Sequence, residues 1–163
     1  MSILKDFKVW SALKKKEIEI QSLAIGLNST VDFTADKHIV MLDFDIKDPN
    51  SVIESIQETQ LFWHLGDAHI IRTRNGFHAY FFTSIVPYAR LKQIIDYSCH
   101  VDPMYKFISK YYDHKTLRVA GKYKDKDLTF FKLIKSPHKP NYDVDLGLIK
   151  KSEFETMSNV RLH

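Results

Sequence analysis

Apolar positions recur along the chain with periods of two and of about 3.6, which predicts both strands and helices. The strand-like segments are His38–Asp45, Ala68–Thr73, Phe77–Thr83, Thr116–Tyr123 and Leu128–Ile134. The helix-like segments are Val52–Gln60, after a turn at Asp48–Ser51, and a second one from Pro87 to about Ser98. This order predicts an α/β (α+β) fold, with a mixed or antiparallel sheet covered by helices.

Turn residues indicate how neighbouring strands connect. Arg74-Asn75-Gly76 contains the Asn-Gly pair that favours a tight hairpin. The residues Lys124–Asp127 separate the last two strands, so a second hairpin is predicted there. Nearer the ends, the patterns predict a short helix at Leu4–Leu13, a strand at Glu17–Leu27, and a strand and short helix within Val144–Met157.

Length and composition predict a single-domain protein and argue against several classes, such as disulfide-rich, membrane-spanning and secreted proteins. A chain of 163 residues suits one domain with its own core, so we expect a single domain over residues 1–163. One Cys excludes an internal disulfide and a multi-thiolate zinc site. The apolar runs are short for a membrane span, and the first residues lack the apolar core of a signal peptide. We therefore expect a soluble, cytoplasmic or otherwise intracellular protein that is not secreted.

The charge balance is mildly basic, with 24 Lys and Arg against 20 Asp and Glu. A net charge of +4 favours a polyanionic partner such as nucleic acid. Lysines cluster at Lys14–Lys16 and Lys122–Lys126, and solvated surfaces are the alternative interpretation of both clusters.

Asp43 and Asp45 are candidate metal ligands, and Asp102 is a further acidic position of interest. Asp43 and Asp45 share one face of their strand because side chains alternate, and such a pair repels unless a cation or a proton lies between them. Oxygen ligands suit Mg²⁺ or Mn²⁺. Asp102 precedes Pro103, so it fits either a third acid on a strand or the N-cap of a helix. A solvated pair at a strand end remains the alternative for the first two.

Candidate phosphate-binding residues lie in two places: Arg72, Arg74, Gly76 and His78 around the first hairpin, and Arg118 and Lys122 further on. Arginine offers forked donors to phosphate oxygens, and glycine allows a close approach of the backbone. Arg118 and Lys122 share a face if their segment is a strand. An ordinary hairpin and an amphipathic strand are the alternatives.

In this order the motifs resemble the catalytic core of the archaeo-eukaryotic primase superfamily, which includes the small primase subunit and the primase-polymerases of plasmids, viruses and mobile elements. The matching segments are Leu42-Asp43-Phe44-Asp45, Gly76-Phe77-His78 and Val101-Asp102, and Leu117-Arg118-Val119 is similar to a later strand of the family. The resemblance covers about residues 37–131. Many members have Ser where Gly76 stands, and Asp96 and Asp113 compete for the place of the third acid.

The resemblance implies an RRM-like core and a metal-dependent nucleotidyltransferase used in DNA replication. It implies a DNA primase or primase-polymerase that makes or extends a primer on single-stranded DNA from NTPs or dNTPs. Two Mg²⁺ or Mn²⁺ ions would be held by Asp43, Asp45 and Asp102, with no zinc. The nucleotide would be bound by Arg72, Arg74, Gly76, His78, Arg118 and Lys122. A helicase or a large primase subunit is the implied partner.

Two other functions remain open. The short chain, the missing zinc module and Gly76 fit a non-catalytic nucleic-acid-binding module on the same fold. Asp45-Ile46-Lys47 supplies the Asp-x-Lys spacing of many metal-dependent nucleases. The phosphate loop of P-loop NTPases, the dinucleotide-binding glycines and the nucleophile elbow of hydrolases are all absent from the sequence.

Overall fold

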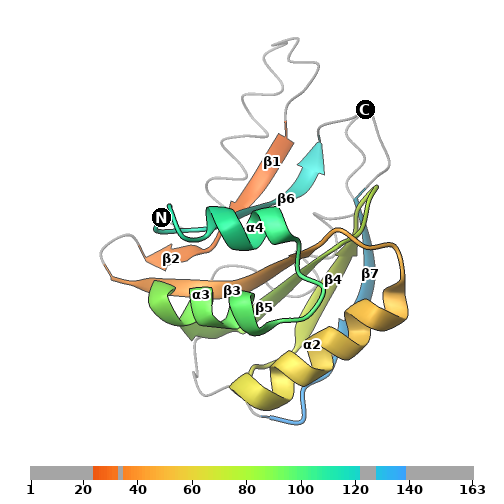
Figure 1. Ribbon diagram of the computed structural model, residues 1–163, viewed down its shortest axis with the longest axis horizontal. Helices are drawn as coiled ribbons and strands as arrows, with labels where there is room; N and C mark the ends of the chain where they lie inside the picture. The colour runs from red at the N-terminus through yellow and green to blue at the C-terminus, as the bar shows by residue number, and fades with distance from the viewer. Residues whose placement is uncertain (1–23, 33–34, 122–127, 139–163) are drawn as a thin grey trace.

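The computed structural model describes residues 24–32, 35–121 and 128–138 (Figure 1). Its elements are β1 (Ala24–Asn28), β2 (Thr30–Asp32), β3 (Lys37–Phe44), α2 (Pro49–Trp63), β4 (Ala68–Arg72), β5 (Phe77–Val86), α3 (Tyr88–Tyr97), α4 (Pro103–Ile108), β6 (Thr116–Gly121) and β7 (Thr129–Ile134). The helix predicted at Leu4–Leu13 and the elements predicted within Val144–Met157 lie outside the described residues. The strand predicted at Glu17–Leu27 is described from Ala24 onward, where β1 begins.

The strands form two antiparallel sheets. Five strands make the main sheet in the order β2-β3-β5-β4-β7, and β1 pairs with β6 in a smaller sheet. The chain passes from β3 through α2 to β4, and β5 lies between those two strands. The predicted α+β class, with an antiparallel sheet and covering helices, is confirmed.

The second predicted hairpin is wrong. β6 pairs with β1, whereas β7 pairs with β4 at the edge of the main sheet. Consecutive strands are neighbours in only about two-thirds of cases. The intervening Lys124-Asp125-Lys126-Asp127 also lacks the Asn-Gly or Gly pair that fixes a tight turn. The first hairpin, β4 to β5, forms as its Asn-Gly turn predicts.

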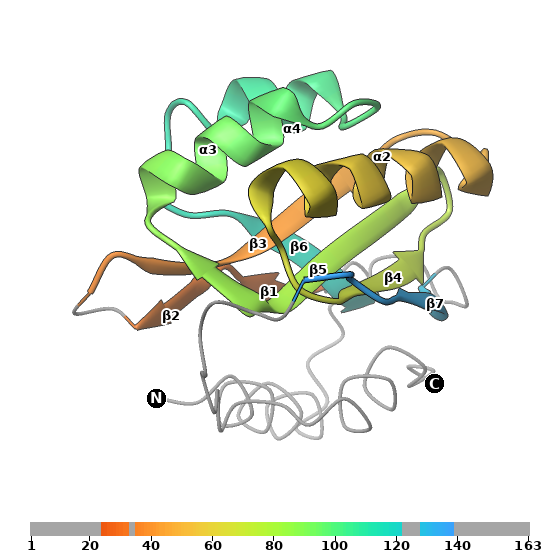
Figure 2. The same cartoon turned by 90° about the horizontal axis from the view of Figure 1, so that it is seen from below.

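The core lies between the main sheet and the helices, which gather on one side of it (Figure 2). Strand positions 42 and 44 of β3 share a face with positions 77 and 79 of β5, and all four side chains are buried. The helices contribute further buried apolar side chains: Val52 and Ile56 from α2, and Leu91, Ile94 and Ile95 from α3. The other face of the same two strands carries Asp43, His78 and Tyr80.

Capping residues determine where the helices begin. The Asp48 carboxylate accepts hydrogen bonds from the backbone N–H groups of Asn50 and Ser51, at 3.3 and 3.0 Å, and Pro49 opens α2. Asp102 caps α4 in the same way, so the N-cap interpretation of Asp102-Pro103 is confirmed. Among the described helices, none has the length and apolar character needed to cross a membrane.

Candidate functional site

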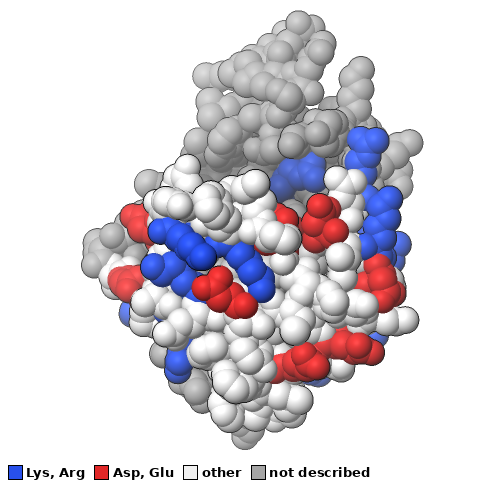
Figure 3. Space-filling model, in the orientation of Figure 1, with Lys and Arg blue, Asp and Glu red and all other residues white. Residues whose placement is uncertain are grey.

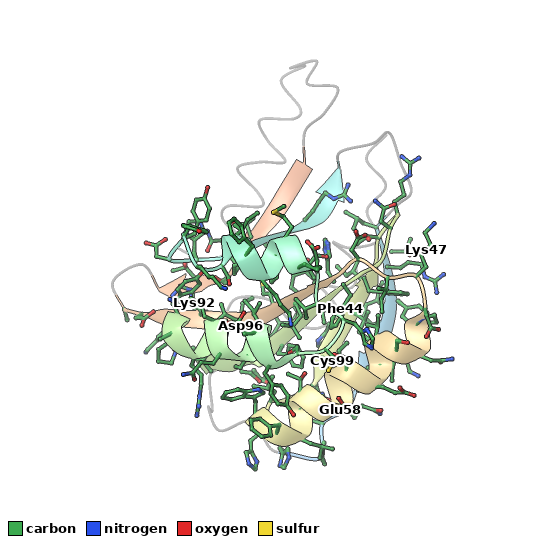
Figure 4. The ribbon with its side chains drawn as sticks, viewed as in Figure 1. Phe44, Lys47, Glu58, Lys92, Asp96 and Cys99 are labelled. Carbon is green, nitrogen blue, oxygen red and sulfur yellow. The ribbon has the colours of Figure 1, made fainter. Side chains whose placement is uncertain are left out.

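Asp43 and His78 lie side by side near the end of β3, whose last residue, Phe44, is labelled in Figure 4. In the β3–β5 register Asp43 lies directly opposite His78. Their side chains point to the same face, and Asp43 Oδ1 lies 3.4 Å from His78 Nε2. The histidine side chain is 9% exposed and the aspartate 28%, so the carboxylate is the one that solvent and ligands reach.

The hydrogen bonds of His78 determine which ring nitrogen carries the proton. Its Nδ1 lies 2.9 Å from the backbone carbonyl of Arg118, which can only accept, so Nδ1 donates. The Tyr80 hydroxyl donates to the same carbonyl at 3.1 Å. Burial lowers the pKa of His78 to about 4, so the ring is neutral at pH 7. The lone pair of Nε2 therefore faces the Asp43 carboxylate, and a proton or a cation must lie between these two acceptors.

The edge of β3 brings Asp102 to this place. The Asp43 carbonyl points away from β5 and accepts a hydrogen bond from the Asp102 backbone N–H at 2.8 Å. Two residues earlier, the Met41 carbonyl accepts a hydrogen bond from the Tyr105 hydroxyl at 3.0 Å. These two bonds attach the start of α4 to the outer edge of β3. The third candidate acid is thus held beside the first by one backbone and one side-chain hydrogen bond.

The carboxylate of Asp102 already has a structural task. It accepts hydrogen bonds from the backbone N–H groups of Met104 and Tyr105, at 3.2 and 3.0 Å, and so caps α4. An ionised carboxylate offers about four lone-pair sites, so two such bonds leave acceptor capacity for another ligand. Asp102 is therefore both an N-cap and an acid close to Asp43.

The charges around Asp43 oppose its ionisation. Burial, followed by the negative charges of Asp102 and Asp45, raises the pKa of Asp43 to about 7. The positive charges of Lys115 and Arg118 act in the opposite direction. The Asp43 carboxyl therefore holds its proton up to a higher pH than an ordinary aspartate does, and a bound cation would replace that proton.

Lys115 was not identified from the sequence. It is buried just before β6, and its ammonium donates to the backbone carbonyl of Tyr105 at 3.1 Å while lying over the ring of the same residue. Burial lowers the pKa of Lys115, and the negative charges of Asp43 and Asp102 oppose that shift. A single lysine that follows Asp113 and His114 and precedes a strand carries no sequence signal for this position.

The remaining cationic candidates are not all brought together. Arg118 lies on β6 and influences the charge of Asp43, whereas Arg72 is paired with Phe77 and so lies on the opposite face from His78. The Arg72 guanidinium stacks over the rings of Phe77 and Phe131, at 5.4 and 4.7 Å.

The β4–β5 turn carries two of the candidates, Arg74, which is exposed, and Gly76. Another candidate, Lys122, lies outside the described residues. Gly76 packs directly against the backbone where β3 ends, and a Cβ at this position would overlap with the Phe44 carbonyl. The glycine thus keeps the hairpin close to the segment that carries Asp43 and Asp45.

The competing acids and the nuclease-like lysine lie elsewhere. Asp96 is exposed on α3, and Asp113 bonds to His114 at 2.7 Å. Asp45 and Lys47 are both exposed after the end of β3. Asp45 is nevertheless close enough to Asp43 for its negative charge to raise the pKa of Asp43.

The donor chemistry of the three acids fits a hard divalent cation. Carboxylate oxygens are the ligands that Mg²⁺ and Mn²⁺ prefer, and Asp43 and Asp102 retain unused lone pairs. Within the described ranges, however, no three His, Cys, Asp or Glu side chains already form a group suited to hold a metal ion. Asp45 and Asp102 are close enough to Asp43 to raise its pKa. Their carboxylates do not, however, point to one common position in the described structure.

Comparison with known proteins gives no assignment. No protein-family model matches the chain, and neither the curated proteins nor the solved structures contain a match.

Proposed function

We propose that the chain is a metal-dependent nucleotidyltransferase, a DNA primase or primase-polymerase that acts on single-stranded DNA with NTPs or dNTPs. The observation that supports this most is the meeting of Asp43, His78 and Asp102. These three residues come from separate segments of the chain but lie close together at the end of β3. Their order along the sequence is that of the motifs in the primase resemblance. The run β3-α2-β4-β5-α3, with β5 between β3 and β4, is in keeping with the RRM-like core that the resemblance implies.

The proposal gives each group a task. Asp43, Asp45 and Asp102 would hold Mg²⁺ or Mn²⁺, which would supply positive charge for the attacking 3′-hydroxyl and the leaving pyrophosphate. His78 is oriented by the Arg118 carbonyl, and its Nε2 lone pair would face the same cation as the Asp43 carboxylate, or would accept the Asp43 proton when no cation is bound.

The triphosphate would be bound by cations close to this strand end. Arg118 already influences the charge of Asp43, and Arg74 and Gly76 lie in the adjacent turn, so these residues are the proposed phosphate contacts. Arg72 would contribute only after leaving its stack on Phe77 and Phe131. Lys122 and a helicase or large-subunit partner remain part of the proposal.

Primer extension and de novo synthesis on single-stranded DNA test the proposal. Labelled NTPs and dNTPs are supplied with Mg²⁺ or Mn²⁺, and wild type is compared with Asp43→Asn and with the control Asp96→Asn. Asp96 is an exposed acid on α3, so its substitution removes the same charge away from the site. We expect product from wild type and Asp96→Asn and none from Asp43→Asn. Equal product from all three would refute the assignment of the metal site.

A non-catalytic nucleic-acid-binding module is the second candidate. It is favoured by the capping task of Asp102, whose carboxylate already accepts two backbone hydrogen bonds. This function predicts nucleic-acid binding without nucleotide incorporation in any metal. A reaction without added nucleotides, on a labelled strand, tests the nuclease alternative in the same series, since only a nuclease shortens the strand.

A further inference from the structure

An exposed apolar surface follows α4 and the turn after it. Eight large apolar side chains are exposed in the described residues, and five of them lie here: Met104, Phe107, Ile108, Tyr111 and Tyr112. Tyr111 is 69% exposed, Tyr112 59% and Phe107 54%. Single exposed apolar side chains are common, but a contiguous group of them marks a binding surface. These five residues, with Lys106 and Lys110, are called the α4 surface below.

The aromatic side chains of the α4 surface are arranged as a platform. The rings of Phe107 and Tyr111 touch, with centroids 5.0 Å apart and planes tilted by 53°. Tyr112 follows directly, with its ring centroid 6.4 Å from that of His114. Exposed rings that are held by neighbouring rings offer faces on which planar bases stack, whatever the base sequence.

The charge of this segment matches a polyanion. From Pro103 to Tyr112 the chain carries two lysines and no acidic residue. The Lys106 ammonium donates to the backbone carbonyls of Asp96 and Ser98, at 3.0 and 2.8 Å, and neutral carbonyls hold the side chain without cancelling its charge. Lys110 is exposed. Figure 3 shows basic side chains gathered over α3 and α4, beside a smaller acidic group.

The α4 surface begins at the candidate site. Asp102 caps α4, and its backbone N–H bonds to the Asp43 carbonyl. A helix of six residues is about 9 Å long, which is under three base steps at about 3.4 Å each. A strand lying on these rings would therefore reach the acids within a few nucleotides.

We propose that the α4 surface binds single-stranded nucleic acid, with bases stacked on Phe107, Tyr111 and Tyr112 and phosphates paired with Lys106 and Lys110. Unpaired bases are required because only they expose the faces that stack on such rings. That this strand serves as the template rests on the proposed function, whereas the binding itself does not.

Fluorescence anisotropy with a labelled oligothymidylate and the full chain tests the surface, at a series of salt concentrations and without metal. Phe107→Ala/Tyr111→Ala should weaken binding at least about fivefold for each stacked base that is lost. Lys110→Ala should reduce the slope of log affinity against log salt by about 0.7. The matched control is Leu61→Ala/Phe62→Ala, which removes two exposed apolar side chains from α2 and should bind as wild type does.

The outcomes separate this inference from the enzymatic proposal. The binding assay contains neither metal nor nucleotide, so it measures the α4 surface independently of nucleotide incorporation. If wild type makes no product while the α4 variants still lose binding, the enzymatic proposal fails and the α4 surface stands. Unchanged affinity in the folded α4 variants overturns the inference. So does binding of phosphatidylserine vesicles that depends on the same rings, in a protein that does not bind the oligonucleotide.

Discussion

The carboxyl of Asp43 shows how strongly single residues feel their surroundings in this fold. Its pKa is about 7 in the folded chain and 3.8 in the unfolded one, so the folded state binds the extra proton more tightly. This contribution to stability is present at low pH and is lost as the pH rises from about 4 to about 7. His78 has the opposite effect, because its lowered pKa costs stability as the pH falls from 6.5 towards 4.

Substitution of Asp43 by Asn isolates the carboxyl, because His78 remains in both proteins. We expect Asp43→Asn to gain stability relative to wild type as the pH is raised from 4.5 to 8, by about 1 kcal/mol or more after allowance for solvent screening. Thermal unfolding of both proteins without divalent metal measures this difference. A difference that stays constant with pH would show that Asp43 ionises normally. Mg²⁺ should stabilise only wild type, and more at pH 8 than at pH 4.5.

Gly76 is a position where the absence of a side chain is required by the packing. A methyl group there would overlap with the Phe44 carbonyl, which is backbone and moves only with the end of β3. We therefore expect Gly76→Ala to cost about 1–3 kcal/mol or more and to reduce nucleotide incorporation, because Asp43 and Asp45 would move. Urea unfolding measures the stability. Asn75→Ala, in the exposed part of the same turn, is the control and should be close to neutral.

At the level of elements, the two tasks of Asp102 can be separated by choice of substitution. Asparagine caps a helix about as well as aspartate but carries no charge, whereas alanine loses both the cap and the charge. We expect Asp102→Ala to lower the free energy of unfolding by about 0.5–2 kcal/mol and Asp102→Asn to change it much less. Both should abolish metal-dependent incorporation if the charge is needed. An active Asp102→Asn protein would leave Asp102 with the capping task alone.

Elements with strong local signals were predictable from the sequence. The Asn-Gly turn gave the β4–β5 hairpin. The residues Asp48–Ser51 correctly marked the region where a helix begins, but α2 starts at Pro49, three residues before the predicted start at Val52. The pairing of β6 with β1 was not predictable, because the choice between partners depends on which edge is left open by the rest of the sheet. Local patterns carry no information on that choice.

The candidate site, like the fold, was predictable only where a local sequence pattern determines it. Alternation predicted a shared strand face for Asp43 and Asp45, but β3 ends at Phe44, and only the influence of Asp45 on the pKa of Asp43 shows that the two acids are close. The same rule could not say that Arg72 lies on the far face of the sheet from His78. That needs the β4–β5 register, which depends on the length of the turn. Lys115 and the hydrogen bond from Asp102 to Asp43 join residues distant in sequence, and no motif marks them.

For the whole molecule, the strand order predicts where the structure opens last. β5 and β3 lie inside the main sheet and carry many of its fully buried side chains, whereas β2 and β7 lie at its edges. We expect the slowest amide hydrogen exchange in β5 and β3, and faster exchange in β2 and β7. Exchange followed by mass spectrometry of peptides measures this order. Equal protection in all five strands would mean that the sheet opens only by global unfolding.

The hydrogen bonds on the outer edge of β3 have a further consequence, for solubility. Unpaired carbonyls on a strand edge recruit strands from other molecules, which is a common start of aggregation. The Asp102 amide and the Tyr105 hydroxyl occupy the Asp43 and Met41 carbonyls, so this stretch of the edge is closed to a foreign strand. The segment that brings the third acid to the site therefore also protects the chain against self-association.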